Sequence, residues 1–260
     1  MITRELILSE DAPIASMAAR ARDFLAVSLD DQYSWRNSET ALAEWRKSIQ
    51  AAGVFVFKDA FREDEYSGFS LFDDVFPIIY VNNSSAKTRQ VFTLFHELAH
   101  LLFHTSGIDT LEEHYVDALQ GREKHIEVVC NRFASQIVVP DAAFDDAIEN
   151  YNHSEHTAEM LADKFSVSRE MIYRKFVDRR WIDQAEYERA ARKWGSQLQR
   201  GGSGGDYYRT TISYLGSEYI SLALNSYHQN KIDDEKLGEY LNTKPKNVGA
   251  LAERFLTRKG

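Results

Sequence analysis

The spacing of apolar residues changes from helical to extended within the first third of the chain. Residues 13–52 repeat apolar positions at helical spacing, and Gly53 is a typical residue after a helix end. Three short runs rich in β-branched and aromatic residues follow, separated by turns with acidic, Gly or Ser residues. These runs predict strands of one small sheet at 54–57, 69–72 and 77–82.

Helical spacing returns after the third predicted strand. Asn, Ser and Ser at 83–85 are suited to cap a helix that contains VFTLFHELAHLLFH, residues 91–104. Residues 105–122 show a less regular pattern. A second helix is predicted over 124–139 because its apolar residues share one face, and Pro140 ends it.

The second half of the chain is helical in pattern with one interruption. Residues 157–182 fit a helix, a tight turn and a second helix, and Ser168 is placed to cap the second one. The stretch GSQLQRGGSGGD, residues 195–206, is a predicted linker because Gly and Ser at this density do not sustain a helix or a strand. Residues 207–260 are again helical in pattern.

Composition narrows the class of protein. The 260 residues are 43% hydrophobic and 27% charged, which is ordinary for a globular protein and too apolar for disorder. No apolar run approaches the roughly 20 residues that cross a bilayer, and the start of the chain lacks the features of a secretory signal. The lone Cys130 excludes an internal disulfide framework. We therefore expect a cytoplasmic protein without a membrane partner, and the net charge of −9 disfavours bulk attraction to nucleic acid.

The helix that contains residues 91–104 carries three ionisable side chains among apolar ones: His96, Glu97 and His100. Burying a polar group without a partner costs about 2–7 kcal/mol, so these side chains need strong partners or an exposed face. Residues four apart lie on the same face of a helix, so the two imidazoles point at one place, as a divalent metal requires. Glu97 lies about 100° around the helix and reaches a water molecule rather than the metal. This is the H-E-x-x-H arrangement of zinc peptidases.

A catalytic zinc site needs a third protein ligand. The metzincin extension is absent, because Phe103 and Ser106 stand where Gly and His would be needed. The gluzincin arrangement needs a Glu on a second helix, followed one turn later by an acidic or amide residue. Glu127 and Asn131 have this spacing, so we predict Glu127 as the third ligand and Asn131 as a residue that orients the site.

The stretches SGFSLFDDVFPIIYVNNS, RQVFTLFHELAHLLFH and IEVVCNRFASQIVVP resemble the ImmA/IrrE family of zinc metallopeptidases over roughly residues 50–145. The resemblance implies an α+β, zincin-like fold of gluzincin type. It implies that Zn2+ is held by His96, His100 and Glu127, with Glu97 as the catalytic base. It also implies that the substrate is a specific bacterial or phage-type repressor.

Four domains or segments are predicted on this basis. They are a zincin-like metallopeptidase domain at 1–148, a helix–turn–helix-like module at 153–194, the linker at 195–206 and a C-terminal helical domain at 207–260. The predicted function is a zinc-dependent endopeptidase that cleaves a helix–turn–helix transcriptional repressor and relieves repression, in a stress, phage or mobile-element response. The alternative is a DNA-binding transcriptional regulator with a structural or vestigial zinc site.

Peptide hydrolysis also needs a group that stabilises the oxyanion, and Tyr80, His104, His114 and His125 are all candidates. His104 continues the stripe of the two histidine ligands, but it lies about 12 Å along the axis from the first of them. It cannot share the metal in one straight helix. We expect His104 to cap the helix or support the site rather than to act directly in catalysis.

Cys130 lies one turn from Glu127. We expect a small packed side chain at this position. The alternative is a thiolate that approaches the zinc, blocks its open position and makes the activity sensitive to oxidation.

The helix–turn–helix-like module is locally basic. Residues 164–180 carry six basic residues against Glu170 and Asp178, a local charge of +4 that could meet DNA phosphates. The alternative is that the module packs on the peptidase domain as scaffold or docks the substrate protein. The acidity of the whole chain favours this alternative over DNA binding. The six basic residues are Lys164, Arg169, Arg174, Lys175, Arg179 and Arg180.

Overall fold

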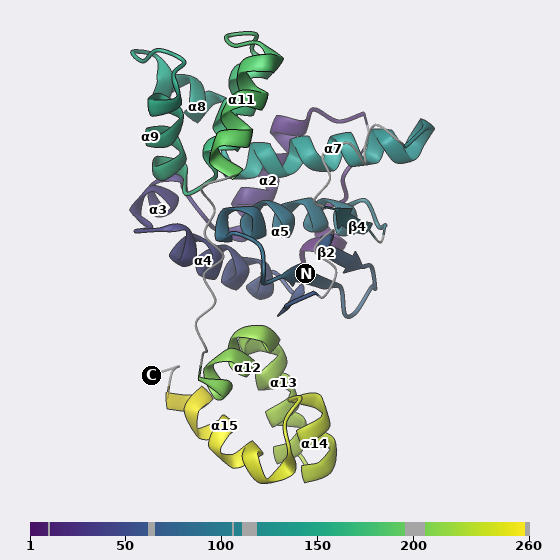
Figure 1. Ribbon diagram of the computed structural model, residues 1–260. Helices are drawn as coiled ribbons and strands as arrows, with labels where there is room; N and C mark the ends of the chain where they lie inside the picture. Colours follow the sequence, from purple (N-terminus) through teal and green to yellow (C-terminus); the bar gives the residue numbers. More distant parts are fainter. Residues whose placement is uncertain (10, 62–65, 106, 111–118, 196–205, 258–260) are drawn as a thin grey trace.

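The computed structural model describes residues 1–9, 11–61, 66–105, 107–110, 119–195 and 206–257 (Figure 1). Helices dominate, and the strands lie in the first half of the chain. The elements are α1 (Ile2–Glu5), α2 (Ile14–Leu25), α3 (Leu29–Ser34), α4 (Ser38–Ala51), β1 (Phe55–Asp59), β2 (Tyr66–Leu71), β3 (Ile78–Asn82), α5 (Lys87–Leu102), β4 (Gly107–Thr110), α7 (Gly121–Val138), α8 (Asp141–Ile148), α9 (Glu155–Phe165), α10 (Arg169–Asp178), α11 (Gln184–Gly195), α12 (Tyr207–Leu215), α13 (Ser217–His228), α14 (Asp234–Tyr240) and α15 (Pro245–Thr257).

The strands form one mixed sheet in the order β1-β3-β2-β4. β1 is parallel to β3, whereas β2 is antiparallel to both of its neighbours. The three predicted strands are confirmed with shifted bounds. No regular element was predicted for residues 105–122, and for residues 107–110 this prediction is wrong. These residues form β4 because they pair with β2, which their local sequence pattern does not indicate.

α5 is the central helix of the molecule. It lies between the sheet on one side and α7 on the other (Figure 1). Because protein covers both sides, every residue from Thr93 to Leu102 is buried. Trp45 of α4 packs edge-on against Phe95 of α5, with ring centroids 4.8 Å apart. The helix that carries the H-E-x-x-H motif is therefore held by a rigid core.

The start of α5 differs from the prediction. The prediction that residues 83–85 cap this helix is wrong, since α5 begins at Lys87 after Ala86 and has no side-chain cap. The polar side chains stabilise the preceding turn instead. Asn82 accepts hydrogen bonds from the backbone N–H and the hydroxyl of Ser84, at 3.0 and 2.7 Å. The predicted cap depended on residue types alone, whereas in the structure the hydroxyl of Ser84 donates to Asn82 in the turn after β3.

Two hydrophobic cores are present among the described residues. One contains buried residues from Ile2 to Trp194, and the other contains buried residues from Ile212 to Phe255. The helices α9 and α10 share the first core with the sheet and α5. The residues on the two sides of the predicted boundary near residue 150 therefore belong to one hydrophobic core. Of the predicted linker, residues 196–205 lie outside the described part of the chain.

The second core belongs to helices α12–α15, called here the C-terminal module (residues 207–257) (Figure 1). This module packs against the edge strand β1. Arg46 of α4 donates hydrogen bonds to the carbonyls of Val56, Ser213 and Tyr214. Burial lowers the pKa of Arg46 to about 10, and the carbonyls at the end of α12 compensate the buried charge.

The predicted helix pair at 157–182 is present as α9 and α10. Ser168 caps α10 by accepting a hydrogen bond from the backbone N–H of Met171 at 3.1 Å, which confirms the predicted cap. Among the described residues, no helix is both long and apolar enough to cross a membrane.

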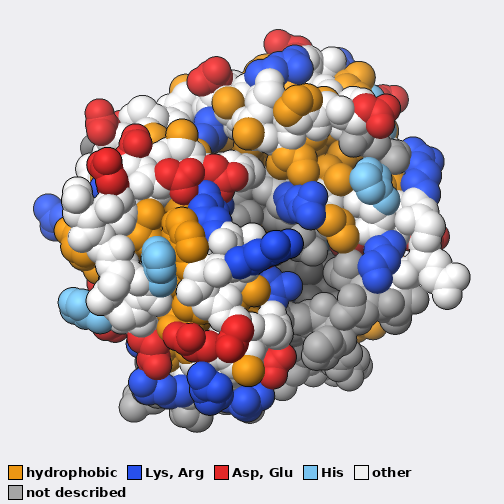
Figure 2. Space-filling model, turned by 90° about the horizontal axis from the view of Figure 1, so that it is seen from above, with side chains coloured by type: hydrophobic (Ala, Val, Ile, Leu, Met, Phe, Trp, Pro, Cys, Tyr) orange, Lys and Arg blue, Asp and Glu red, His pale blue; other side chains and the backbone are white. Residues whose placement is uncertain are grey.

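Most basic side chains of α9 and α10 have acidic partners. Lys175, which is 4% exposed, and Arg179 both contact Asp141, at 2.9 and 3.0 Å, and Arg179 also contacts Asp145 at 2.8 Å. The face seen in Figure 2 accordingly shows Asp and Glu side chains among the Lys and Arg side chains. These pairs favour the interpretation of α9 and α10 as scaffold over a DNA-binding surface.

Candidate metal centre

His96 and His100 lie one turn apart on α5, and their Nε2 atoms are 3.1 Å apart. Both side chains are buried, at 1% and 3% exposure. Their i, i+4 spacing places the two rings on one face of the helix. The fully buried Phe95 and Leu98 on the other faces hold the helix against rotation.

Glu127 comes from α7, and its carboxylate faces both imidazoles. Its Oε2 lies 3.2 Å from Nε2 of His96, and its Oε1 lies 3.2 Å from Nε2 of His100. α7 takes this position because Phe133 and Ile137 bury its apolar face in the main core. The structure therefore brings together the three residues that the sequence predicts as ligands.

The donor atoms of these three residues fit a divalent metal. Two ligands that each lie about 2.0–2.1 Å from a tetrahedral zinc ion are about 3.3 Å apart. The observed spacings of 3.1 and 3.2 Å are close to this value. Two imidazoles and one carboxylate are also a donor set found in catalytic zinc sites. We call His96, His100 and Glu127 the metal group.

The electrostatic state of Glu127 suits a ligand. Burial acts to raise the pKa of this carboxyl, but hydrogen bonds from His100 and His96, together with their charge, outweigh burial and lower the pKa to about 2. The carboxylate is therefore ionised at neutral pH, which is the form that binds a cation.

Asn131 lies one turn after Glu127 and contacts His96. Its Oδ1 is 3.0 Å from Nδ1 of that ring. An amide oxygen can only accept, so Nδ1 of His96 donates and carries the proton. When a metal replaces the proton on Nε2, the lone pair of that atom is directed at the metal group. Asn131 thus selects the tautomer that a ligand needs.

Glu97 directly follows His96 on α5, and its side chain is completely buried and contacts the sheet. The hydroxyl of Ser70 on β2 donates a hydrogen bond to Oε2 of Glu97 at 2.6 Å. Sequence reasoning missed Ser70. The signal was the run of small residues in YSGFSL, where the other strands carry large apolar ones, but the facing helix residue could be found only from the strand register.

β4 crosses directly over His100. A Cβ atom added to Gly107 would lie 2.6 Å from Cγ and Cδ2 of that ring, so this strand can pass only with glycine at this position. Sequence reasoning missed Gly107 as well, because β4 itself was not predicted. The outer strand of the sheet thus runs beside the metal group.

The two further candidate residues on the ligand helices lie outside the metal group. His104 follows α5 with a φ of +56°, stacks on Phe72 and lies 3.0 Å from the carbonyl oxygen of Thr3 through its Nε2. Cys130 is 0% exposed and belongs to the main core.

The oxyanion candidates have different positions. Tyr80 lies on the face of the sheet opposite α5, stacked between Phe57 and Phe69 at 5.0 and 4.9 Å. His125 is exposed on α7, and His114 lies outside the described residues. The structure therefore places Tyr80 and His104 away from the metal group.

Comparison with known proteins places this arrangement in a family. The family model Peptidase_M78, described as the IrrE N-terminal-like domain, matches residues 49–177, which include the whole metal group. Over these residues the chain belongs to the ImmA/IrrE family of metallopeptidases. The described α+β structure fits this domain.

A curated relative in the family is the radiation response metalloprotease IrrE of Deinococcus radiodurans. It is 31% identical over 99 residues, which are 37% of this chain and 30% of the relative. The match thus spans about a third of that relative and less than half of this chain.

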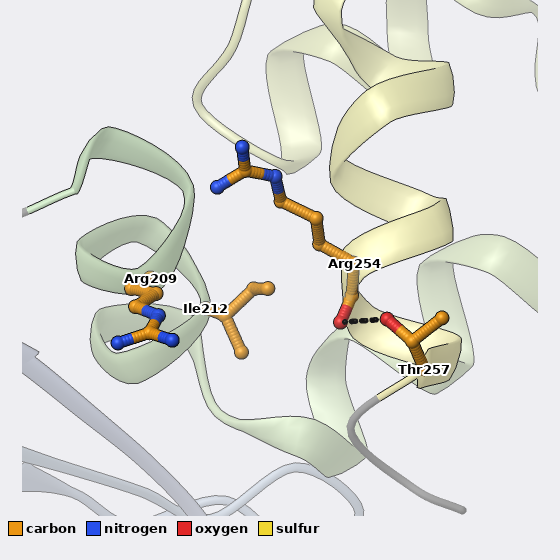
Figure 3. A pocket seen from close by; sticks show the side chains of 4 residues that line it. All are labelled: Arg209, Ile212, Arg254 and Thr257. Atoms are coloured by element: carbon orange, nitrogen blue, oxygen red, sulfur yellow. Dashed lines mark hydrogen bonds between the residues drawn. The ribbon is translucent and has the colours of Figure 1, made fainter.

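The C-terminal module contains a separate cavity of about 540 Å³. Arg209, Ile212, Arg254 and Thr257 line it (Figure 3). Arg254 pairs with Asp206 at 2.6 Å, and the guanidinium groups of Arg209 and Arg254 do not point at a common centre in Figure 3. The cavity therefore does not present a converging set of ligand groups.

Proposed function

We propose that this chain is a zinc-dependent endopeptidase that cleaves a specific helix–turn–helix transcriptional repressor and thereby relieves repression. The observation that carries the proposal is the burial of Glu97 on α5, at the position that directly follows the candidate ligand His96. A structural metal site needs only the ligands, whereas hydrolysis needs a base next to them.

His96, His100 and Glu127 would hold the zinc. When bound, zinc supplies a Lewis acid and makes a water molecule acidic enough to ionise near neutral pH. Glu97 removes the proton from the attacking water and then delivers it to the leaving amine. Its burial suits this exchange, because a carboxylate excluded from bulk water stays available for the reacting groups.

The substrate is proposed to lie extended along the edge of β4 that does not face β2. Within the described residues, β4 pairs with β2 on one side and ends the sheet. A peptide segment could pair with the other side as an added strand, which would place its backbone beside His100. This mode favours a flexible segment of a folded protein, such as a linker between two domains of a repressor.

The family supports a regulatory role. The relative in Deinococcus radiodurans is a radiation response metalloprotease, and we extend a stress, phage or mobile-element response to this chain as part of the proposal. A transcriptional repressor acts in the cytoplasm, so the proposed site of action is cytoplasmic.

The deciding experiment incubates the zinc-loaded chain with the purified repressor encoded beside it, with and without chelator. We expect one or two defined fragments by mass spectrometry, and none when chelator is present. The Glu97→Gln variant should keep its zinc and lose about 10²–10⁴ in rate, because general base catalysis contributes that much. An intact repressor under all conditions, or cleavage by the Glu97→Gln variant at the rate of the unaltered chain, contradicts the proposal.

The competing function is a DNA-binding regulator with a structural or vestigial zinc. The two successive helices α9 and α10, with Ser168 capping the second, support it, but Lys175 and Arg179 pair with Asp141. A gel shift with the local promoter tests it. Sequence-specific retention by the zinc-loaded chain, together with an uncleaved repressor, would favour this function over the peptidase.

A further inference from the structure

We propose that Ser70 is a positioning residue that fixes the carboxylate of the catalytic base Glu97. This inference rests on the proposed peptidase function and adds a residue to it. It starts from one contact: the Ser70 hydroxyl donates to Oε2 of Glu97 at 2.6 Å, between side chains that are 1% and 0% exposed.

The distance is that of a strong hydrogen bond. An O–H group that donates to an ionised carboxylate does so at about 2.5–2.7 Å, and such bonds are roughly twice as strong as neutral ones. Both partners are buried, so bulk water does not compete with the hydroxyl for this carboxylate oxygen. The contact is therefore specific to Ser70.

A glutamate base needs such a contact. The last torsion of a Glu side chain is broad, so the carboxylate plane is not set by the helix backbone. A proton must be taken and returned in a defined direction, and small errors of placement are costly in catalysis. The hydroxyl of Ser70 pins one oxygen and so fixes the rotation of the carboxylate.

β2 is built to bring this hydroxyl close to α5. A Cβ atom added to Gly68 would lie 2.5 Å from Cγ2 of Thr93, so only glycine lets the strand approach the helix there. Ser70 follows two residues later on the same strand, paired with Ile79 on one side and Gly107 on the other. The rung that contains Ser70 therefore places its hydroxyl at Glu97 and the bare backbone of Gly107 at His100.

The same strand offers a matched control. Ser67 is also 1% exposed and also on β2, but its hydroxyl lies 3.4 Å from Nη2 of Arg89. Replacing Ser67 with Ala removes a buried hydroxyl from the same strand without touching the contact to Glu97. A general loss of packing in β2 would appear in both variants.

The test compares Ser70→Ala, Ser70→Thr and Ser67→Ala in the zinc-loaded full chain with the repressor as substrate. We expect Ser70→Ala to lower kcat by about 10–100-fold with unchanged KM and zinc content, since residues that orient active groups contribute this much. Ser70→Thr, which keeps the hydroxyl, and Ser67→Ala should retain most of kcat. A Ser70→Ala enzyme with the kcat of the unaltered chain overturns the proposal, as does a Ser70→Thr enzyme as slow as Ser70→Ala.

An infrared measurement separates this inference from the proposed function. The difference spectrum between the unaltered chain and Glu97→Gln isolates the carboxylate band of Glu97 without any substrate. The same difference in the Ser70→Ala background should show this band shifted, and in the Ser67→Ala background it should be unshifted. An inactive unaltered chain refutes the peptidase function, whereas a band unmoved by Ser70→Ala refutes the role of Ser70.

Discussion

Two clusters of charged and polar side chains join helices in this protein, and they differ in how their charges are balanced. The metal group between α5 and α7 consists of His96, His100 and Glu127. The second cluster joins α10 to α8 and consists of Lys175, Arg179, Asp141 and Asp145, called here the ion-pair cluster. Both lie against the same core.

The difference lies in the balance of charge. In the ion-pair cluster, ammonium and guanidinium groups face carboxylates at 2.8–3.0 Å, so the protein itself compensates the buried charge of Lys175. In the metal group, by contrast, the ligand atoms of two imidazoles and one carboxylate face one another at 3.1–3.2 Å. Such a group is stable only when protons or an external cation fill it. The comparison teaches that the ion-pair cluster is neutralised by its own side chains, whereas the metal group has the donor set of a candidate cation site.

Removing the metal should have the largest effect on stability. A ligand that binds only the folded state at about 1,000 times its Kd stabilises by about 4 kcal/mol. Chelation should therefore lower the free energy of unfolding of the unaltered chain by about this amount, measured by urea denaturation. The Glu127→Gln variant should respond far less to chelator. An equal response of both chains would mean that zinc stabilises the protein from another site.

Replacing Asn131 with Ala should have the next largest effect, and it acts only on the metal group. The tautomer of His96 is then no longer selected by the amide oxygen. We expect the affinity for zinc to fall about 10–100-fold, measured by competition with a coloured chelator. Unchanged affinity would show that the ring is oriented by its packing alone.

The ion-pair cluster should respond through stability and not through zinc. Asp141→Asn leaves the buried Lys175 with less compensation, whereas Lys175→Met leaves Asp141, which is 45% exposed, still paired with Arg179. We expect Asp141→Asn to cost about 1–2 kcal/mol and Lys175→Met less than about 1 kcal/mol, by urea unfolding. The reverse order of these two costs, or a loss of zinc in either variant, would break the distinction between the clusters.

A pH series should give the smallest effect. Burial acts to raise the pKa of Asp141, but the hydrogen bond and charge of Lys175 and hydrogen bonds from Arg179 and Gln136 outweigh it, so the pKa lies below 3.8. A carboxyl with a lower pKa in the folded state stabilises above its unfolded pKa, and this contribution is lost as the pH falls below about 4. The gap in unfolding free energy between the unaltered chain and Asp141→Asn should therefore narrow between pH 6 and pH 3, about one unit below the unfolded Asp pKa. A constant or widening gap would contradict this linkage.

The sequence by itself determined the features that depend on neighbours in the chain. The helical spacing of residues 91–104, the meeting of His96 with His100 and the Ser168 cap all follow from contacts within one helix or turn. The motif spacing also pointed to Glu127, which lies on a second helix. Its place beside the histidines became visible only when α7 packed on α5.

The tertiary structure alone decided the features that join distant segments. β4 is a strand because β2 pairs with it. Ser70 contacts Glu97, 27 residues later in the sequence, because β2 faces α5. Two of the basic residues predicted as a DNA surface, Lys175 and Arg179, pair with Asp141 of α8, which only the packing of these helices could reveal. Local spacing sets what one helix presents, but strand pairing and charge compensation depend on which surfaces the apolar core brings together.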